Sequence, residues 1–137
     1  YNMADYWGHW LKIGTFTDAS NLPRIYAVNW FRKDAEGKFI WPGFGDNSRV
    51  LEWIIKRLDG DAEAVDTAIG RVPAEGAIDY SGLDISEAHK DELFAIDPVT
   101  WLAESNLTEE YFDKFGDRVP AALRGQLDSL RERLQNA

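Results

Sequence analysis

The chain has 137 residues, of which 45% are hydrophobic and 28% charged, with a formal net charge of −9 at pH 7 and no cysteine. This length and composition predict one globular domain with a buried core, and they exclude a disordered chain, a disulfide framework and a thiolate metal site. The acidic balance and the absence of a long apolar run argue against nucleic acid and membrane partners.

The start of the chain predicts an aromatic helix from Met3 to Ile13, with Gly14 suited to end it. The large apolar side chains of this segment fall on one helical stripe; they are Tyr6, Trp7, Trp10 and Leu11. Because the chain opens on Tyr1 in the middle of an aromatic-rich region, we expect it to be a fragment of a longer protein.

Residues 24–41 predict a β-hairpin. Arg24 to Phe31 is rich in β-branched and aromatic residues, which favour a strand. The charged segment 32–38 suits a turn, with Gly37 able to adopt positive φ. Phe39 to Trp41 returns as a short second strand, so that Phe31 and Phe39 become neighbours across the hairpin if they pair.

A helix is predicted after this hairpin, from about residue 48 to residue 58. Pro42-Gly43 ends the second strand, and Gly60 is suited to end the helix. Three consecutive residues, Asp46, Asn47 and Ser48, are competent N-caps. The predicted order at this point is therefore helix, hairpin, helix.

The rest of the chain predicts mostly helices. A short strand is possible at 68–73, and a helix is expected at 86–94. Asp97-Pro98 suits the start of another helix, which runs toward Phe115 with a possible break near Asn106. Pro120 begins a last helix whose leucines form a stripe, namely Leu123, Leu127, Leu130 and Leu134.

These elements predict an α+β fold, a short β-hairpin flanked by helices and followed by a helical tail. We expect one domain over residues 1–137. Its residues 1–60 would carry the hairpin and the following helix, and its residues 61–137 would form the mostly helical tail.

Residues 31–47, which run from the predicted hairpin to the start of the next helix, are rich in aromatic side chains and are called the aromatic loop below. This loop could hold a flat ligand. Phe31 and Phe44 could be the two walls of a slot for a nucleobase, and Phe39 could close one edge. The stretch Gly45–Asn47 could read the base edge through backbone N–H groups at a helix start and through the amide of Asn47, by its donors or its oxygen. The aromatic pattern by itself favours a hydrophobic cluster at a hairpin–helix junction over a slot.

Other sites with recognisable motifs are not indicated. The chain has no GxxxxGK[ST] or GxGxxG phosphate loop, no HExxH or EF-hand metal pattern and no GxSxG nucleophile elbow. Its two histidines, His9 and His89, are far apart in sequence. We therefore predict no metal ligand and no catalytic residue in this chain.

The stretch "VNWFRKDAEGKFIWPGFGDNSRVLEWI", Val28 to Ile54, resembles the guanine-binding segment of GTP-dependent phosphoenolpyruvate carboxykinases. The opening "YNMADYWGHWL" is similar to the family segment that precedes it, with Met3-Ala4 in place of the usual Phe-Gly. The resemblance is strongest over the first 60 residues and looser from Asp61 onward. It implies that the chain is part of the larger α/β C-terminal nucleotide domain of that family.

The resemblance implies a role for each residue of the loop. Guanine would stack between Phe31 and Phe44 and touch Phe39, which favours the slot over the hydrophobic cluster. The base-reading stretch of the family falls on Phe44, Gly45, Asp46 and Asn47, with Asp46 in place of the commoner Glu. Trp30 and Trp41 alternate with the slot positions and would pack inward.

The family enzyme is a cytoplasmic, gluconeogenic lyase that converts oxaloacetate and GTP to phosphoenolpyruvate, GDP and carbon dioxide with Mn²⁺ and Mg²⁺. Its phosphate loop, metal ligands and substrate arginines would lie upstream of Tyr1 and have no matching positions here. The resemblance therefore implies that the chain binds the guanine nucleotide, that it partners the missing N-terminal part of the same enzyme, and that it is inactive alone. The alternative is a non-enzymatic interaction module whose exposed aromatic loop grips a peptide or a partner domain.

Overall fold

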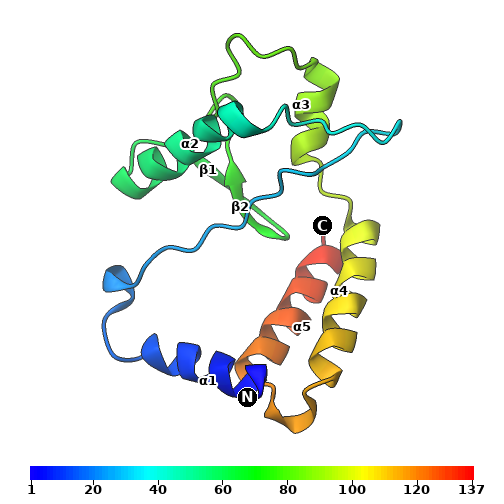
Figure 1. Cartoon of the computed structure of the whole chain (residues 1–137). Helices are drawn as coiled ribbons and strands as arrows, with labels where there is room; N and C mark the ends of the chain where they lie inside the picture. The colour runs from blue at the N-terminus through cyan, green and yellow to red at the C-terminus, as the bar shows by residue number, and fades with distance from the viewer. The chain divides into compact units, whose positions relative to one another are not determined.

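The structure is a computed structural model that describes all residues, 1–137. It contains five α-helices and one antiparallel pair of strands, which confirms the predicted α+β class (Figure 1). The helices are α1 (Met3–Ile13), α2 (Asn47–Asp59), α3 (Glu87–Phe94), α4 (Pro98–Asp113) and α5 (Ala121–Gln135), and the strands are β1 (Ala64–Thr67) and β2 (Gly70–Pro73). Three single 3-10 turns complete the order, at η1 (Ala19–Asn21), η2 (Phe44–Asp46) and η3 (Gly116–Arg118).

The chain divides into two compact units, one made of residues 1–23 and 96–137 and the other of residues 24–95. The first unit is helical and the second holds the strands, α2, α3 and the aromatic loop. The division of the chain at residue 60 stays a prediction. No helix is both long enough and apolar enough to cross a membrane.

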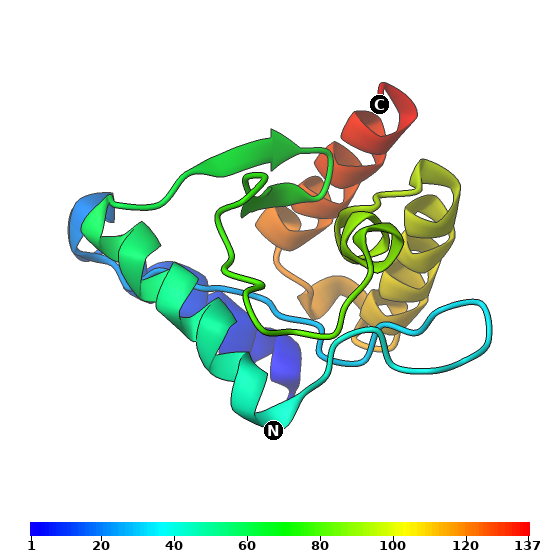
Figure 2. The same cartoon turned by 90° about the horizontal axis from the view of Figure 1, so that it is seen from above.

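The first unit is built on the pair α4 and α5, which lie side by side in both views (Figures 1 and 2). The leucine stripe of α5 supplies the buried residues Leu127 and Leu134, which are 7% and 2% exposed. At the other end of α4, the Trp7 ring of α1 packs against the rings of Phe112 and Phe115, at 5.7 and 5.0 Å between centroids. The bounds predicted for α1 are confirmed.

Helix α4 runs without interruption through Asn106, so the predicted break there is wrong. The Asn106 side chain does not compete with the helix backbone, because its oxygen accepts a hydrogen bond from Arg131 of α5 at 2.9 Å. The same guanidinium donates to Ser105 Oγ and to Glu109 Oε2, each at 2.9 Å. The bond from Arg131 also lowers the pKa of the Glu109 carboxyl. Polar side chains that would weaken an isolated helix thus join two helices here.

Helix α4 begins at the predicted Asp97-Pro98 pair. The Asp97 carboxylate accepts the backbone N–H of Thr100 at 3.0 Å and that of Val99 at 3.4 Å, and it also accepts the Thr100 hydroxyl. These hydrogen bonds, the one from the Thr100 side chain above all, lower the pKa of Asp97. The carboxylate therefore stabilises the folded chain above the pKa that Asp97 has in the unfolded state, and this contribution is lost as the pH falls through the lower folded pKa.

We expect Asp97→Ala to lower the midpoint of urea unfolding at pH 7, because two helix N–H groups lose their acceptor. The difference from the wild type should shrink as the pH falls below the pKa of a free aspartate, about 3.9. Asp97→Asn is the matched control, since an amide still caps the helix but does not titrate. A wild type and Asp97→Asn with the same pH dependence would contradict this account.

The second unit has a small core under helix α2. Trp53, Ala62 and Ile78 are buried together, with Tyr26 and Val50 among the partly buried residues that pack on them.

Gly60 ends α2 with φ 87°, the left-handed conformation that glycine adopts without strain, as the sequence predicts. The predicted strand at 68–73 is confirmed only over β2, and its partner β1 was not predicted. The start of α3 at the predicted Ser86 is capped by the Ser86 hydroxyl, which accepts the His89 N–H.

The hairpin predicted for Arg24–Phe31 and Phe39–Trp41 is wrong. Only a single bridge forms, between Lys33 and Phe39, and residues 24–31 are not a strand. A strand needs a hydrogen-bonded neighbour along its length, and the returning segment is too short to supply one. Pro42 has no N–H to donate, and Gly43 turns the chain away with φ 86°. What remains is a tight turn at 34–38, with Gly37 at φ 79° as predicted.

Candidate nucleotide-base site

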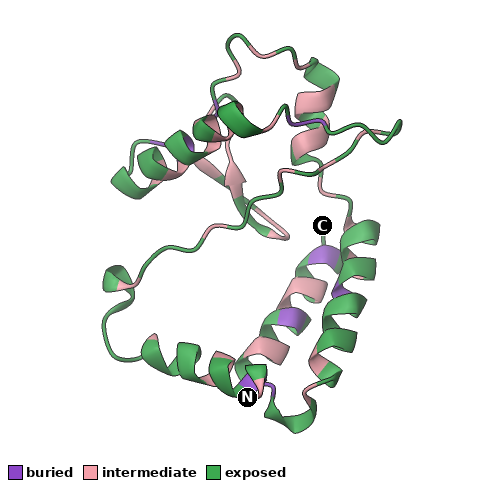
Figure 3. Ribbon diagram, in the orientation of Figure 1, coloured by how far each residue is buried: buried purple, intermediate pink, exposed green.

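The three phenylalanines singled out in the sequence are exposed. Phe31 is 69%, Phe39 57% and Phe44 98% exposed, whereas the core of the second unit is made by other residues. The loop from Phe31 to Phe39 is almost wholly open to solvent (Figure 3). These rings therefore do not form the hydrophobic cluster that the aromatic pattern by itself favours.

Phe31 and Phe39 lie together at the start and end of the loop. Their ring centroids are 5.9 Å apart with the planes at 64°, which is an edge-to-face contact. The Lys33 ammonium lies 5.0 Å from the centroid of Phe39, a cation–π distance. Phe44 forms no ring pair with either residue. The structure thus joins two of the three predicted slot residues and places the third on a separate turn.

The loop that carries these rings is fixed by two side chains that the sequence reasoning missed. Asp34 Oδ1 accepts the N–H groups of Glu36 and Lys38 at 3.0 and 2.8 Å. The Arg32 guanidinium donates to the carbonyls of Leu93 and Ala95, at 3.4 and 3.0 Å. An aspartate followed three residues later by glycine is a turn signal that indicates the first of these roles. The contacts of Arg32 with residues about 60 positions away leave no local signal.

The turn that carries Phe44 depends on Gly43. Its φ of 86° and ψ of −167° lie in a region that only glycine occupies readily. The chain then forms η2, in which the Asp46 N–H donates to the Gly43 carbonyl at 3.0 Å, and continues into α2. Gly45 is exposed and has open space where a Cβ would stand. This stretch of backbone is therefore accessible next to the fully exposed Phe44 ring.

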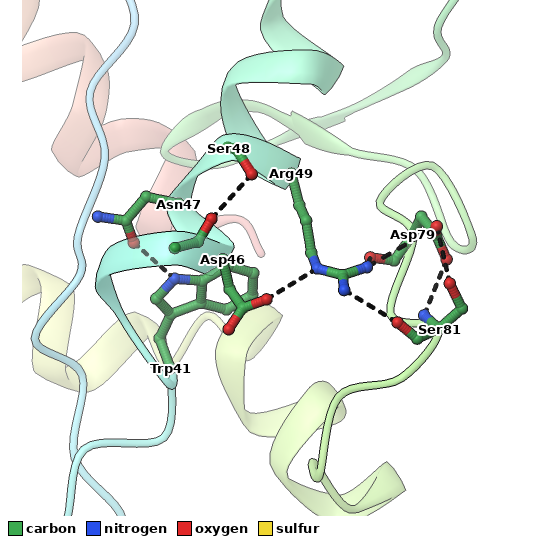
Figure 4. Close-up of polar contacts among 8 residues, drawn as sticks. Trp41, Asp46, Asn47, Ser48, Arg49, Asp79 and Ser81 are labelled. Carbon is green, nitrogen blue, oxygen red and sulfur yellow. Dashed lines mark hydrogen bonds and ion pairs between the residues drawn. The ribbon is translucent and has the colours of Figure 1, made fainter.

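Asp46 is paired with Arg49, an interaction that the sequence reasoning did not predict. Arg49 Nε lies 3.1 Å from Asp46 Oδ1, and the other guanidinium nitrogens donate to the carbonyls of Asp79 and Ser81 at 2.8 and 2.9 Å (Figure 4). The Asp46 carboxylate accordingly does not cap α2 through its side chain. Hydrogen bonds from the Ser81 backbone and hydroxyl lower the pKa of the neighbouring Asp79. Arg49 therefore ties the start of α2 to the segment 79–81.

Asn47, the first residue of α2, is bonded to the indole of Trp41. Trp41 Nε1 donates to Asn47 Oδ1 at 2.8 Å. The Trp41 ring is 5% exposed and packs against Trp30, with 6.4 Å between ring centroids. The predicted inward packing is thus confirmed for Trp41, and Trp30 is half-buried. Asn47 itself is half-buried, next to the exposed Gly45.

The acidic side chains around α2 are held by hydrogen bonds and ion pairs within the chain. No group of three or more His, Asp or Glu side chains is placed to hold a cation. Nearby carboxylates are engaged elsewhere, as Asp46 is with Arg49 and Asp79 with Ser81. The residues present therefore do not fit a manganese or magnesium ion.

Comparison with known proteins identifies the family. The family model described as "Phosphoenolpyruvate carboxykinase C-terminal P-loop domain" matches residues 1–133. Relatives named phosphoenolpyruvate carboxykinase [GTP] include those of Treponema pallidum (strain Nichols), 50% identical over 138 residues, and Neocallimastix frontalis, 48% identical over 138 residues, each matching 100% of this chain. That of Arthrobacter sp. (strain FB24) is 48% identical over 134 residues, or 98% of this chain.

The match covers only part of each relative. The chain spans 22% of the length of these three proteins. The P-loop in the name of the family model has no GxxxxGK[ST] counterpart among these residues. Because the family model covers nearly the whole chain, the chain belongs to the GTP-dependent phosphoenolpyruvate carboxykinase family, within its C-terminal P-loop domain.

Proposed function

We propose that this chain is the guanine-recognition part of a GTP-dependent phosphoenolpyruvate carboxykinase. The parent enzyme would be a cytoplasmic lyase of gluconeogenesis that converts oxaloacetate and GTP to phosphoenolpyruvate, GDP and carbon dioxide. The remainder of that enzyme would be the partner of this chain and would supply the phosphate loop, the manganese and magnesium ions and the catalytic residues. The 137-residue chain alone is then expected to form no phosphoenolpyruvate in an assay with oxaloacetate, GTP and both metals.

One observation carries the proposal, namely that Phe31, Phe39 and Phe44 are all exposed, in the segment that precedes α2, in a chain of a GTP-dependent family. Exposed apolar side chains that gather on one stretch of surface often mark a binding site, and a purine offers two flat faces to aromatic rings. Phe31 and Phe44 would be the walls of the slot and Phe39 would touch the base at one edge. Gly45, Asp46 and Asn47 would lie along the edge of the base.

The role of this site would be positioning. A base held between two rings fixes one end of the nucleotide, so that the phosphates at the other end are delivered in line with the substrate. The tight turn held by Asp34 and the anchor of Arg32 on the end of α3 would keep the loop that carries Phe31 and Phe39 in place before the nucleotide arrives. Guanine would be preferred to adenine through hydrogen bonds to its edge, because the wrong base leaves site groups unpaired.

We expect Phe44→Ala to weaken GDP binding by about 5- to 150-fold, the equivalent of ~1–3 kcal/mol for one stacked base. The measurement is isothermal titration calorimetry of GDP and ADP with the whole carboxykinase that contains this sequence. Phe16→Ala is the matched control, since Phe16 is 66% exposed but lies outside the aromatic loop.

Two results would count against the proposal. One is equal affinity of the wild-type enzyme for GDP and ADP, which would remove base selection. The other is a loss of GDP affinity in Phe44→Ala no larger than in Phe16→Ala, which would leave the exposed ring without a role in base binding. Capture of a peptide or protein domain by the aromatic loop, abolished by Phe44→Ala, would favour the interaction module instead.

A further inference from the structure

We propose that Trp41 is a positioning residue that makes the base site select a 6-oxopurine over a 6-aminopurine. Its indole N–H holds the Asn47 amide in one orientation, with the amide oxygen on the indole and the NH₂ group directed away from it, where it would meet the base. This inference rests on the proposed function, because the orientation of the amide matters only if a base lies beside it.

The chemistry of the two side chains fixes the orientation. An indole nitrogen can only donate a hydrogen bond, so the Asn47 atom that lies 2.8 Å from Trp41 Nε1 must be the oxygen. Figure 4 shows that oxygen directed at the indole, with the amide nitrogen of Asn47 directed away from it. Asn47 Nδ2 makes no hydrogen bond within the chain and is not buried without a partner.

Both partners are held firmly, so the amide does not rotate freely. The Trp41 ring is 5% exposed, and a buried indole N–H that loses its acceptor is costly. Asn47 is fixed by its backbone, whose N–H donates to the carbonyls of Phe44 and Gly45 as α2 begins. A flip of the amide would bring two donors together at Trp41. The outward NH₂ group is therefore the stable arrangement.

An outward donor discriminates between purines at position 6. Guanine and hypoxanthine carry an acceptor oxygen there, whereas adenine carries an amino group, which is a donor. The NH₂ group of Asn47 would pair with the oxygen and would oppose the amino group. Without the N–H of Trp41, the amide could turn its oxygen outward and accept adenine, so the preference for the 6-oxo base would fall.

The test compares inosine diphosphate with ADP, because inosine diphosphate has the 6-oxo group but not the 2-amino group of guanine. Their ratio of affinities, measured by isothermal titration calorimetry with the whole carboxykinase, reports on position 6 and the adjoining N1, which is a donor in hypoxanthine and an acceptor in adenine, and it is independent of the 2-amino group. Trp41→Phe keeps an aromatic ring and removes the N–H, and we expect it to lower the ratio by about three- to tenfold. Asn47→Asp, which presents acceptors only, should abolish or reverse the preference.

Trp53→Phe is the matched control. It removes another indole N–H of the same unit, the one that donates to the Glu63 carbonyl at 3.3 Å, without touching Asn47. A general loosening of the fold would lower both affinities and leave their ratio unchanged in either variant. If Trp41→Phe does not fold, 3-benzothienylalanine at position 41 keeps the fused ring and lacks the N–H, and it takes the place of the phenylalanine variant.

The outcomes separate the two proposals. A wild-type enzyme that binds inosine diphosphate and ADP equally has no 6-position readout, and base recognition by this site fails with it. If the wild-type preference survives unchanged in a folded enzyme that lacks the indole N–H, the role of Trp41 is overturned. The proposal of guanine binding is then left intact. A ratio that falls as far in Trp53→Phe as at position 41 also overturns the role of Trp41.

Discussion

Replacing Trp53 by alanine is expected to lower the free energy of unfolding by about 3–5 kcal/mol, the range for removing a large aromatic side chain from a core. Trp53 is 6% exposed and packs with Ala62 and Ile78 in the centre of the second unit. Its ring meets that of Tyr26 edge to face, at 6.1 Å and 89°. The small core offers few neighbours that could collapse into the space left behind.

Urea unfolding followed by far-UV circular dichroism measures this effect. Trp10→Ala is the matched control, because Trp10 is 59% exposed on α1 and its loss leaves no buried cavity. A loss of stability in Trp53→Ala no greater than in Trp10→Ala would show that residues 24–95 do not depend on this core. Trp53→Phe should fall between the wild type and Trp53→Ala, since it keeps most of the apolar surface.

Arg49→Met is expected to cost about 2–4 kcal/mol of unfolding free energy, because one guanidinium serves three acceptors. The Arg49 side chain is only 23% exposed, so water replaces its bonds to Asp46 and to the carbonyls of Asp79 and Ser81 incompletely. Amide hydrogen exchange should rise at the start of α2 and at residues 79–81. Arg49→Lys should recover only part of the loss, since the compact ammonium group of lysine cannot donate in the three directions that the planar guanidinium group serves.

Arg71→Met is the matched control for Arg49. Arg71 Nε lies 2.8 Å from Asp66 Oδ1, a shorter contact than that of Arg49 with Asp46, but its side chain is 66% exposed. Exposed ion pairs contribute little, because water and salt screen them. Similar losses of unfolding free energy in Arg49→Met and Arg71→Met would contradict the view that the low exposure of Arg49 and its contacts with carbonyls stabilise the fold.

Helices with strong end signals could be predicted from the sequence, whereas of the strands only β2 was predicted, as part of 68–73. The Asp97-Pro98 pair and Gly60 mark ends that the structure has within a residue, because caps act locally. Residues 24–31 have strand-favouring side chains, but a strand forms only beside a hydrogen-bonded neighbour. The segment that returns toward them ends at Pro42 and Gly43, so it is too short to be that neighbour. The strands that do form, β1 and β2, are four residues each and carry no clear alternation.

The candidate site, like the fold, could be predicted from the sequence only in part. That Phe31, Phe39 and Phe44 belong to a base slot is an inference from family resemblance, since composition does not distinguish an exposed ring from a buried one. The bonds of Arg49 to residues 30 and 32 positions away, and of Arg32 to residues 61 and 63 positions away, depend on the fold and leave no spacing signal. The contact between Trp41 and Asn47 spans six residues, but only the structure shows that the indole N–H donates to the amide oxygen.

The backbone conformation of Gly43 limits how the loop before α2 can be redesigned. No atom lies within 4 Å of a Cβ added at this position, so the obstacle to substitution is torsional and not one of space. Its φ of 86° with ψ near −167° is closed to side-chain-bearing residues at ordinary cost. Libraries that diversify positions 41 and 44–47 should therefore hold glycine at 43, because most other residues at this position would change the direction of the backbone that carries Phe44.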